Sequence, residues 1–285
     1  MILDVLKVLL LAIVEGITEW LPVSSTGHMI LLEELLSVEH MSVPFYNMFL
    51  YVIQLGAILA VLVLFWNRLY PFSPSKSKEE RGSILRLWGM VLIGVLPAAV
   101  IGLALDSFLE EKVFVPGVRS VVVAAALVLY GVLFIFVERA SRKKSDSLES
   151  LSALTPKTAL LIGAFQVLSI IPGTSRSGST VLGARLLGVS RTVAAEFSFF
   201  MAIPVMVGVS LLKVAKFSLS AIDGEAGYEL SAEPIILLAV GFVAAFAVSL
   251  FVIRFLLDFV RRHSFECFGW YRIALGTLVL LWYFI

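Results

Sequence analysis

Two carboxylates lie close together in an apolar stretch near the amino terminus of this sequence. Glu15 and Glu19 are four residues apart, so a helix would place both on one face. Carboxylates in an apolar membrane segment are costly and are commonly functional. The pair predicts an oxygen-ligand site for a divalent cation or an acid/base pair. The alternative is a helix at the membrane interface, with both carboxylates in water and Trp20 and Leu21 wetted beside them.

Hydroxyl and imidazole groups follow the two carboxylates. Ser25 and His28 lie just after Glu19, and a serine or histidine nucleophile with a carboxylate partner is a common activated arrangement. The alternative for His28 is a solvent-facing residue at the start of a helix. The two other histidines, His40 and His263, lie in polar segments, where we expect them to be solvated.

A second polar stretch, residues 173–180, surrounds an arginine with small residues. Gly173 lets the backbone approach a ligand closely, Ser175 and Thr180 offer hydroxyl groups, and Arg176 supplies a planar guanidinium that suits phosphate. A helix predicted from about residue 177 to residue 187 would point its first N–H groups at the same place. These features predict an anion site. A Ser/Gly-rich helix-packing surface is the alternative, but such a surface has no use for an arginine.

The composition places these stretches in a membrane. The chain has 285 residues, of which 60% are hydrophobic and 15% charged, whereas soluble domains are about 25% charged. The net charge of +1 and the absence of a basic stripe argue against a nucleic-acid partner. A single cysteine, Cys267, excludes an intrachain disulfide and a cysteine zinc cluster. Asp4, Lys7 and the lack of a cleavage site argue against a signal peptide.

Hydropathy predicts an all-α polytopic membrane protein with six transmembrane helices and two re-entrant hairpins. A spanning helix needs about 20 mainly apolar residues, and six stretches qualify: 45–66, 85–105, 117–137, 192–213, 234–256 and 267–285. Regions 1–36 and 157–191 each contain two short apolar runs separated by a Pro/Gly/Ser-rich break. Such irregular backbone is tolerated at membrane depth only where protein or a water-filled cavity satisfies it. We therefore expect these two regions to form the hairpins.

Basic residues gather on one side of this predicted arrangement. Eleven of them fall on one side, namely Arg68, Lys76, Lys78, Arg81, Arg139, Arg142, Lys143, Lys144, Lys157, Arg261 and Arg262. The other side carries three, Lys7, Lys112 and Lys216, with an acidic cluster of Asp223, Glu225, Glu229 and Glu233. Cytoplasmic loops are enriched in Lys and Arg. The bias predicts a cytoplasmic basic side, both termini outside, and hairpins that enter from opposite faces.

The two interrupted regions resemble each other. Pro22 matches Pro172, Ser24 matches Thr174 and Ser25 matches Ser175 at a spacing of 150 residues. An odd number of spans in each half makes the second copy inverted, and paired interrupted segments of this kind mark a site near the membrane midplane. The sequence therefore predicts one integral membrane domain over 1–285. Its repeat halves are about 1–137 and 157–285, joined by a cytoplasmic loop at 138–156. Within the second half, we expect Glu196 to pair with Arg185 or Arg191.

Three sequence strings resemble motifs of the undecaprenyl-diphosphate phosphatase family, also called the bacitracin-resistance family. They are Glu-Gly-Ile-Thr-Glu at 15–19, Leu-Pro-Val-Ser-Ser-Thr-Gly-His at 21–28 and Pro-Gly-Thr-Ser-Arg-Ser-Gly-Ser-Thr at 172–180. The resemblance implies an integral enzyme of the cell membrane that converts a polyprenyl diphosphate to its monophosphate for cell-wall synthesis, with inverted repeats and dependence on Mg²⁺ or Ca²⁺. By this likeness Glu15, Glu19, Ser25 and His28 are catalytic, with the glutamates also binding metal, and Ser175, Arg176 and Thr180 bind the diphosphate.

The expected chemistry is phosphoryl transfer, which depends mainly on positioning and charge neutralisation. The first choice of nucleophile is Ser25, through a phosphoseryl intermediate, with His28 or a carboxylate as base; direct attack by His28 or by a metal-bound water stays open. The cavity is predicted to open to the outer face, with the lipid tail between helices. A transporter or flippase of prenyl phosphates is the alternative function, because inverted repeats are also a transporter architecture. The sequence leaves the oligomeric state open, a homodimer included.

Overall fold

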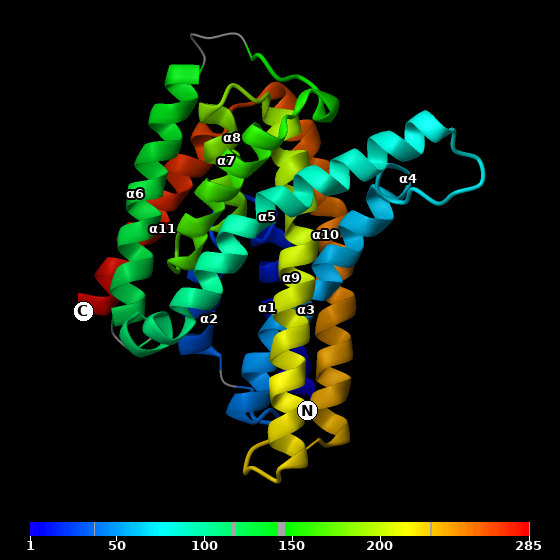
Figure 1. Cartoon of the computed structure of the whole chain (residues 1–285). Helices are drawn as coiled ribbons and strands as arrows, with labels where there is room; N and C mark the ends of the chain where they lie inside the picture. Colours follow the sequence, from blue (N-terminus) through cyan, green and yellow to red (C-terminus); the bar gives the residue numbers. More distant parts are fainter. Residues whose placement is uncertain (37, 114, 116–117, 142–145, 229, 285) are drawn as a thin grey trace.

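The computed structural model is built from helices joined by short connections (Figure 1). It describes residues 1–36, 38–113, 115, 118–141, 146–228 and 230–284. Arg142, Lys143, Lys144 and Glu229, which the charge count above includes, lie outside these residues. Extended structure in the described part of the chain is limited to an isolated bridge between Leu148 and Val189. The all-α prediction is therefore confirmed for that part.

The elements follow one another in a simple order. They are α1 (Ile2–Thr18), α2 (Ser25–Leu35), α3 (Val43–Leu64), α4 (Trp66–Leu69), α5 (Lys78–Lys112), α6 (Val118–Ser141), η1 (Leu151–Ala153), α7 (Pro156–Val167), η2 (Leu168–Ile170), α8 (Arg176–Leu186), α9 (Arg191–Ile222), α10 (Ala232–Arg262) and α11 (Glu266–Phe284).

Five helices in the described residues are long and apolar enough to cross a membrane: α3, α5, α6, α9 and α10. They coincide with the first five spans that hydropathy predicts, and the chain is a multi-pass membrane protein. The last predicted segment also forms a helix, α11, but it is not among the five. The sixth span therefore stays a prediction.

Two interrupted helix pairs lie between the long helices, where the Pro/Gly/Ser-rich breaks occur. After each break the chain turns through a serine with positive φ, Ser24 or Ser175, both at 74°. Each serine then begins a helix of 11 residues, α2 or α8, and its hydroxyl accepts a hydrogen bond from the N–H of Gly27 or Gly178. This is the N-cap interaction that serine favours. In Figure 1, α1 begins at the end of the molecule marked N, whereas α7 begins at the opposite end.

The register of the two breaks differs from the sequence match by one residue. The matching capping serines, Ser24 and Ser175, are 151 residues apart. The pairings of Ser24 with Thr174 and of Ser25 with Ser175 are therefore wrong. The second break has two residues between its proline and its capping serine, whereas the first break has one. One of the two is Gly173, whose φ is 90°. A Cβ on Gly173 would lie 2.6 Å from the carbonyl oxygen of Val123, so only glycine fits there.

Close backbone contacts hold the long helices against one another. A Cβ on Gly56 of α3 would lie 2.3 Å from the carbonyl oxygen of Phe242 in α10. A Cβ on Gly163 of α7 would lie 2.1 Å from the carbonyl oxygen of Gly94 in α5. Small residues at such crossings let membrane helices pack closely. The two glycines therefore fix where α3 meets α10 and where α7 meets α5.

The ion pairs of the second half differ from the expectation. Glu196 accepts two hydrogen bonds from Arg68, at 2.8 and 3.0 Å, so its predicted pairing with Arg185 or Arg191 is wrong. Those two arginines bind Glu138 of α6 instead, at 3.0 and 2.8 Å. Each pair joins segments far apart in the sequence, which local spacing does not reveal.

The expected solvation of His40 is also wrong. Its Nδ1 hydrogen-bonds to the buried carboxylate of Asp4 in α1. Asp4 additionally accepts a hydrogen bond from the backbone N–H of Glu39 at 3.3 Å. The connection between α2 and α3 is thereby tied to the start of α1.

Candidate active site

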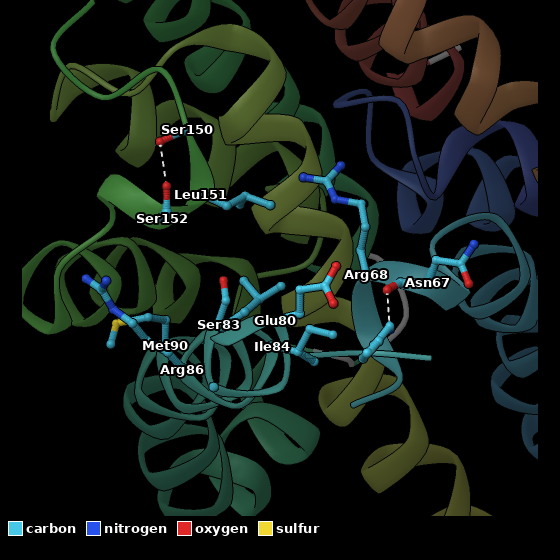
Figure 2. A pocket seen from close by; sticks show the side chains of 13 residues that line it. Asn67, Arg68, Glu80, Ser83, Ile84, Arg86, Met90, Ser150, Leu151 and Ser152 are labelled. Carbon is cyan, nitrogen blue, oxygen red and sulfur yellow. Dashed lines mark hydrogen bonds between the residues drawn. The ribbon is translucent and has the colours of Figure 1, made fainter. Parts of the chain in front are cut away.

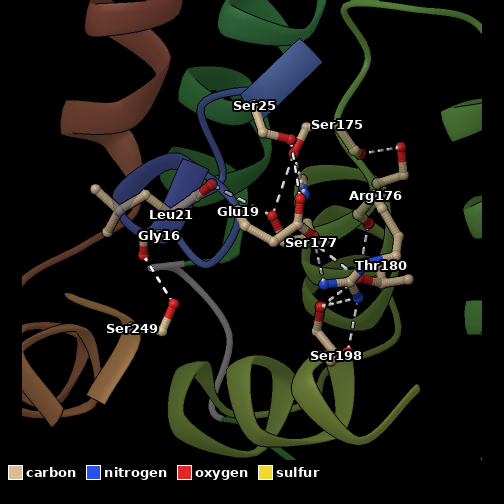
Figure 3. A network of polar contacts seen from close by, with 12 residues as sticks. Gly16, Glu19, Leu21, Ser25, Ser175, Arg176, Ser177, Thr180, Ser198 and Ser249 are labelled. Carbon is tan, nitrogen blue, oxygen red and sulfur yellow. Dashed lines mark hydrogen bonds and ion pairs between the residues drawn. The ribbon is translucent and has the colours of Figure 1, made fainter. Parts of the chain in front are cut away.

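A carboxylate from the first interrupted pair meets a guanidinium from the second. Glu19 directly follows α1, Arg176 is the first residue of α8, and their Oε1 and Nη2 atoms are 3.1 Å apart. Ser25, the first residue of α2, donates a hydrogen bond from its Oγ to Glu19 Oε2 at 2.9 Å. Figure 3 shows that the three side chains converge. The structure thus brings a hydroxyl, a carboxylate and a cation from two distant stretches to one place.

Arg176 is held on its other side by α9. Its Nη1 donates to the carbonyl oxygen of Ser198 at 2.8 Å. The Ser198 hydroxyl lies 2.7 Å from that of Thr180, which also donates to the carbonyl oxygen of Arg176 at 3.0 Å (Figure 3). The predicted residue Thr180 is buried, so it positions the arginine. Ser198 was not predicted, because a serine in an apolar helix carries no signal of a distant partner.

Ser175 organises the turn around the arginine. Its Oγ accepts the Gly178 N–H at 3.1 Å and lies 3.2 Å from the hydroxyl of Ser177. Ser177 in turn donates to the carbonyl oxygen of Leu21 at 3.3 Å. The first turn of α8 is therefore bonded directly to the turn before α2.

Glu15 lies one helical turn before Glu19 and is buried, with 1% of its surface exposed. Its Oε1 has no hydrogen-bond partner in the structure, and the side chain of Gln54 in α3 interacts with its carboxyl group. Buried polar atoms are nearly always paired, so an orphaned carboxylate oxygen calls for an explanation.

The donor set fits a hard divalent cation. Carboxylate oxygens are the ligands that Mg²⁺ and Ca²⁺ prefer, and Mg²⁺ is commonly held by one or two carboxylates together with substrate phosphates. Among the described residues no group of three or more His, Cys, Asp or Glu side chains gathers at one point. The chain would therefore offer Glu15 and Glu19, and other oxygens would complete the shell.

His28 hydrogen-bonds to other partners than the Glu19–Arg176 pair. Its Nδ1 lies 2.8 Å from the carbonyl oxygen of Ser24 and its Nε2 lies 2.6 Å from the hydroxyl of Tyr271 in α11. A carbonyl oxygen only accepts, so Nδ1 donates and Nε2 is the acceptor of the neutral ring. The two rings stack with centroids 5.6 Å apart. Tyr271 was not predicted as a site residue, since aromatic residues near the ends of spans are common.

Arg272 of α11 holds both turns together, and the sequence analysis missed it. The side chain is fully buried and donates to the carbonyl oxygens of Pro22, Gly173 and Thr174 at 3.2, 2.9 and 2.8 Å. Its guanidinium also lies over the ring of Tyr130, 5.6 Å from the centroid. The available signal was an arginine inside an otherwise apolar segment, which is expensive and usually functional or structural.

Burial divides the site into a floor and an accessible face. Glu15, Glu19 and Thr180 are buried, whereas Ser25 and Arg176 are partly exposed. An anion that reaches the guanidinium therefore also reaches the Ser25 hydroxyl. The arrangement can bind a phosphate group, offer it a nucleophile and accept the proton of that nucleophile.

Comparison with known proteins gives one consistent result. The family described as bacitracin resistance protein BacA matches residues 8–278. A protein of Enterococcus faecalis named undecaprenyl-diphosphatase is 48% identical over 284 residues, which cover 98% of this chain and 97% of that protein. A protein of the same name from Acetivibrio thermocellus is 48% identical over 281 residues, 99% of this chain and 98% of the other. The chain therefore belongs to the BacA bacitracin resistance protein family.

Proposed function

We propose that this chain is a membrane phosphatase that converts undecaprenyl diphosphate to undecaprenyl monophosphate and orthophosphate. The observation that carries the proposal is the Glu19 carboxylate, which binds the Ser25 hydroxyl with one oxygen and the Arg176 guanidinium with the other. The relatives named undecaprenyl-diphosphatase, which match nearly the whole chain, supply the substrate class. Bacitracin resistance and recycling of the cell-wall lipid carrier follow from this activity.

The first step transfers the terminal phosphoryl group to Ser25. Arg176 binds the diphosphate, which draws the guanidinium from Glu19 and frees the carboxylate to act as a base. Ser25 Oγ attacks the terminal phosphorus, its proton passes to Glu19 Oε2 over the 2.9 Å hydrogen bond, and the P–O bond of the anhydride breaks. Undecaprenyl monophosphate leaves as an oxyanion that needs no proton. The first N–H groups of α8 stabilise the negative charge.

The second step returns the enzyme to its starting state. Water attacks the phosphorus of phosphoserine, and Glu19 returns the proton that it took in the first step to the departing Ser25 Oγ. Orthophosphate leaves as H₂PO₄⁻ with both protons of the water, which restores the Glu19 carboxylate. The proposed role of His28 is to exchange a proton with the phosphate oxygens through Nε2, which requires that Nε2 release the Tyr271 hydroxyl that it now accepts from. Direct attack by His28 or by a metal-bound water is the competing route. A phosphoryl adduct trapped on Ser25, on His28 or on neither residue in single-turnover conditions separates the three.

A divalent cation held by Glu15 and Glu19 would neutralise phosphate charge during the transfer. The unpartnered Oε1 of Glu15 supports this role. Loss of activity on chelation, with recovery on adding Mg²⁺ or Ca²⁺, is the expected result.

The finer architecture is also part of the proposal. We infer six spans, with α11 as the sixth, and two re-entrant hairpins, α1–α2 and α7–α8, related as inverted repeats. Their support is the pair of capping serines at φ 74° and the entry of α1 and α7 from opposite ends (Figure 1). The positive-inside rule then puts the start of α1 on the outer face of the cell membrane, and we expect the Glu19–Arg176 site to open to that face.

Phosphate release from undecaprenyl diphosphate in detergent tests the proposed activity. The wild-type chain releases orthophosphate, whereas Glu19→Gln and Ser25→Ala lose at least about 100-fold in rate because base or nucleophile is gone. Ser75→Ala, which removes an exposed loop hydroxyl, serves as the matched control and keeps its rate. A pure transporter releases no phosphate without a membrane, so a silent wild-type protein would falsify the proposal.

A further inference from the structure

A cavity outside the Glu19–Arg176 site lies at the end of the molecule opposite to the amino terminus (Figure 1). It has a volume of about 610 Å³ and opens between α4, the first turns of α5 and η1 (Figure 2). Its lining includes Arg68, Lys76 and Arg86, the hydroxyls of Ser83 and Ser152, and an apolar floor that contains Met90. The proposed phosphatase chemistry uses none of these residues.

Positive charge prevails in this cavity. The lining contains three cations and one carboxylate, Glu80, which turns back to accept the N–H of Ser77 at 2.7 Å. Arg68 is neutralised by Glu196. Lys76 donates to the carbonyl oxygen of Tyr70 at 2.6 Å, and Arg86 donates to that of Leu154 at 3.2 Å.

Two of these cations therefore keep their charge uncompensated. Among the described residues no carboxylate forms an ion pair with Lys76 or Arg86. An anion entering the cavity meets two cations that bind only neutral carbonyl groups. Neighbouring serine hydroxyls can donate to its oxygens as well.

Aromatic side chains beside the cavity indicate where it lies relative to the membrane surface. Trp66, Tyr70 and Phe72 are 52%, 37% and 70% exposed. The rings of Trp66 and Tyr70 stack with centroids 4.7 Å apart. Exposed tryptophan and tyrosine gather at the level of lipid headgroups. The cavity thus faces the headgroup layer, where phosphates of anionic lipids are concentrated and attract Lys and Arg.

We propose that this cavity binds the headgroup of an anionic phospholipid, whose phosphate is attracted by the uncompensated charges of Lys76 and Arg86. The serine hydroxyls of α5 and η1 contact the polar headgroup, and the apolar floor receives the first carbons of the lipid. Arg68 stays paired with Glu196, two residues before Ser198, which holds Arg176. The cavity is therefore linked through the Arg68–Glu196 ion pair to α9, the helix that holds Arg176.

Native mass spectrometry of the purified full chain tests this site. The protein in detergent is titrated with phosphatidylglycerol or with phosphatidylcholine, and the fraction that retains one lipid is measured. We expect the wild type to retain phosphatidylglycerol at least about fivefold better than phosphatidylcholine. The double variant Lys76→Gln/Arg86→Gln loses this preference. Arg261→Gln/Arg262→Gln, which removes two exposed cations near the end of α10, keeps it.

The remaining outcomes decide against the proposal. Equal retention of the two lipids by the wild type overturns it, and so does an equal loss in both double variants, which would show a general charge effect. Displacement of phosphatidylglycerol by millimolar inorganic phosphate would assign the cavity to the free anion and overturn the lipid. If the first double variant does not fold, as judged by its melting temperature, Arg86→Gln alone gives the same comparison because Arg86 is exposed.

Discussion

The turns that precede α2 and α8 have the same backbone form but opposite chemistry. Both pass through a serine at φ 74° whose hydroxyl caps an 11-residue helix. At the register of 151 residues, Ser25 corresponds to Arg176 and His28 to Ser179. One turn supplies a hydroxyl and an imidazole, and the other supplies a guanidinium at the position of that hydroxyl.

The same register extends back into the preceding helices. Glu15 corresponds to Gln166, and both are buried with polar atoms that have no partner. Glu19 corresponds to Ile170, so the second pair carries neither carboxylate. The comparison teaches that two turns of the same backbone form can carry complementary groups. The Glu19–Arg176 contact brings a carboxylate beside the first turn together with the guanidinium of the second.

The largest expected effect on the rate of phosphate release comes from removing the guanidinium of Arg176, which has no counterpart in the first turn. Arg176→Ala should slow phosphate release by about 10³-fold, or about 4 kcal/mol of transition-state stabilisation, because the variant loses the guanidinium that binds the diphosphate. Arg176→Lys keeps the charge but not the planar fork, and should recover part of the rate. The matched control is Arg262→Gln, an exposed arginine at the end of α10. A rate for Arg176→Ala within tenfold of wild type would show that the turns do not divide the chemistry in this way.

The next largest effect is on stability, and it comes from replacing Gly173 in the second turn. A Cβ on Gly173 would meet the backbone of Val123 at 2.6 Å, and the residue has φ 90°. Gly173→Ala should therefore lower the free energy of unfolding by about 3 kcal/mol. The melting temperature in detergent should fall by about 6 °C. Gly89→Ala is the control, since no atom lies within 4 Å of its added Cβ. An unchanged melting temperature for Gly173→Ala would mean that the second turn does not need glycine at this position.

A third prediction compares His28 with Ser179, which lie four residues after the capping serines Ser24 and Ser175. His28→Gln should reduce the rate of phosphate release by about 100-fold, the usual scale of acid–base catalysis. Ser179→Ala should change it less than about fivefold, because the Ser179 hydroxyl donates to the carbonyl oxygen of Ser175 at 2.9 Å and acts on stability alone. Steady-state rates of both variants, measured on protein of equal melting temperature, check the difference. Similar losses in the two variants would contradict the assignment of acid–base chemistry to the first turn.

The features of the fold that depend on neighbouring residues could be predicted from the sequence. It predicted the polar breaks, the five long spans and the start of α8 within one residue, since capping serines and apolar runs are local signals. It did not predict Ser198, Tyr271 or Arg272, whose roles come from contacts across the fold. The register was misjudged by one because Gly173 is explained only by its contact with Val123.

The smallest expected effect tests whether the two turns share one backbone device. A non-glycine residue at φ 74° is strained by about 1 to 2 kcal/mol, and the serine cap offsets about 1 kcal/mol of this. Ser24→Ala and Ser175→Ala keep the strain and lose the cap, so each should lower the melting temperature by about 2 °C. Ser24→Gly and Ser175→Gly lose both and should stay within about 1 °C of wild type.

Differential scanning calorimetry of the four variants in detergent measures these shifts. The two alanine variants should shift the melting temperature equally, and so should the two glycine variants. If the two serines differ only in the side chains that surround them, alanine lowers the melting temperature equally at both positions. Glycine then restores it by the same amount at both. A cost at Ser175 well above that at Ser24 would show that the second turn is stabilised by more than its cap. The bond between Ser177 and Leu21 would be the first place to look, since it joins the first turn of α8 directly to the turn before α2.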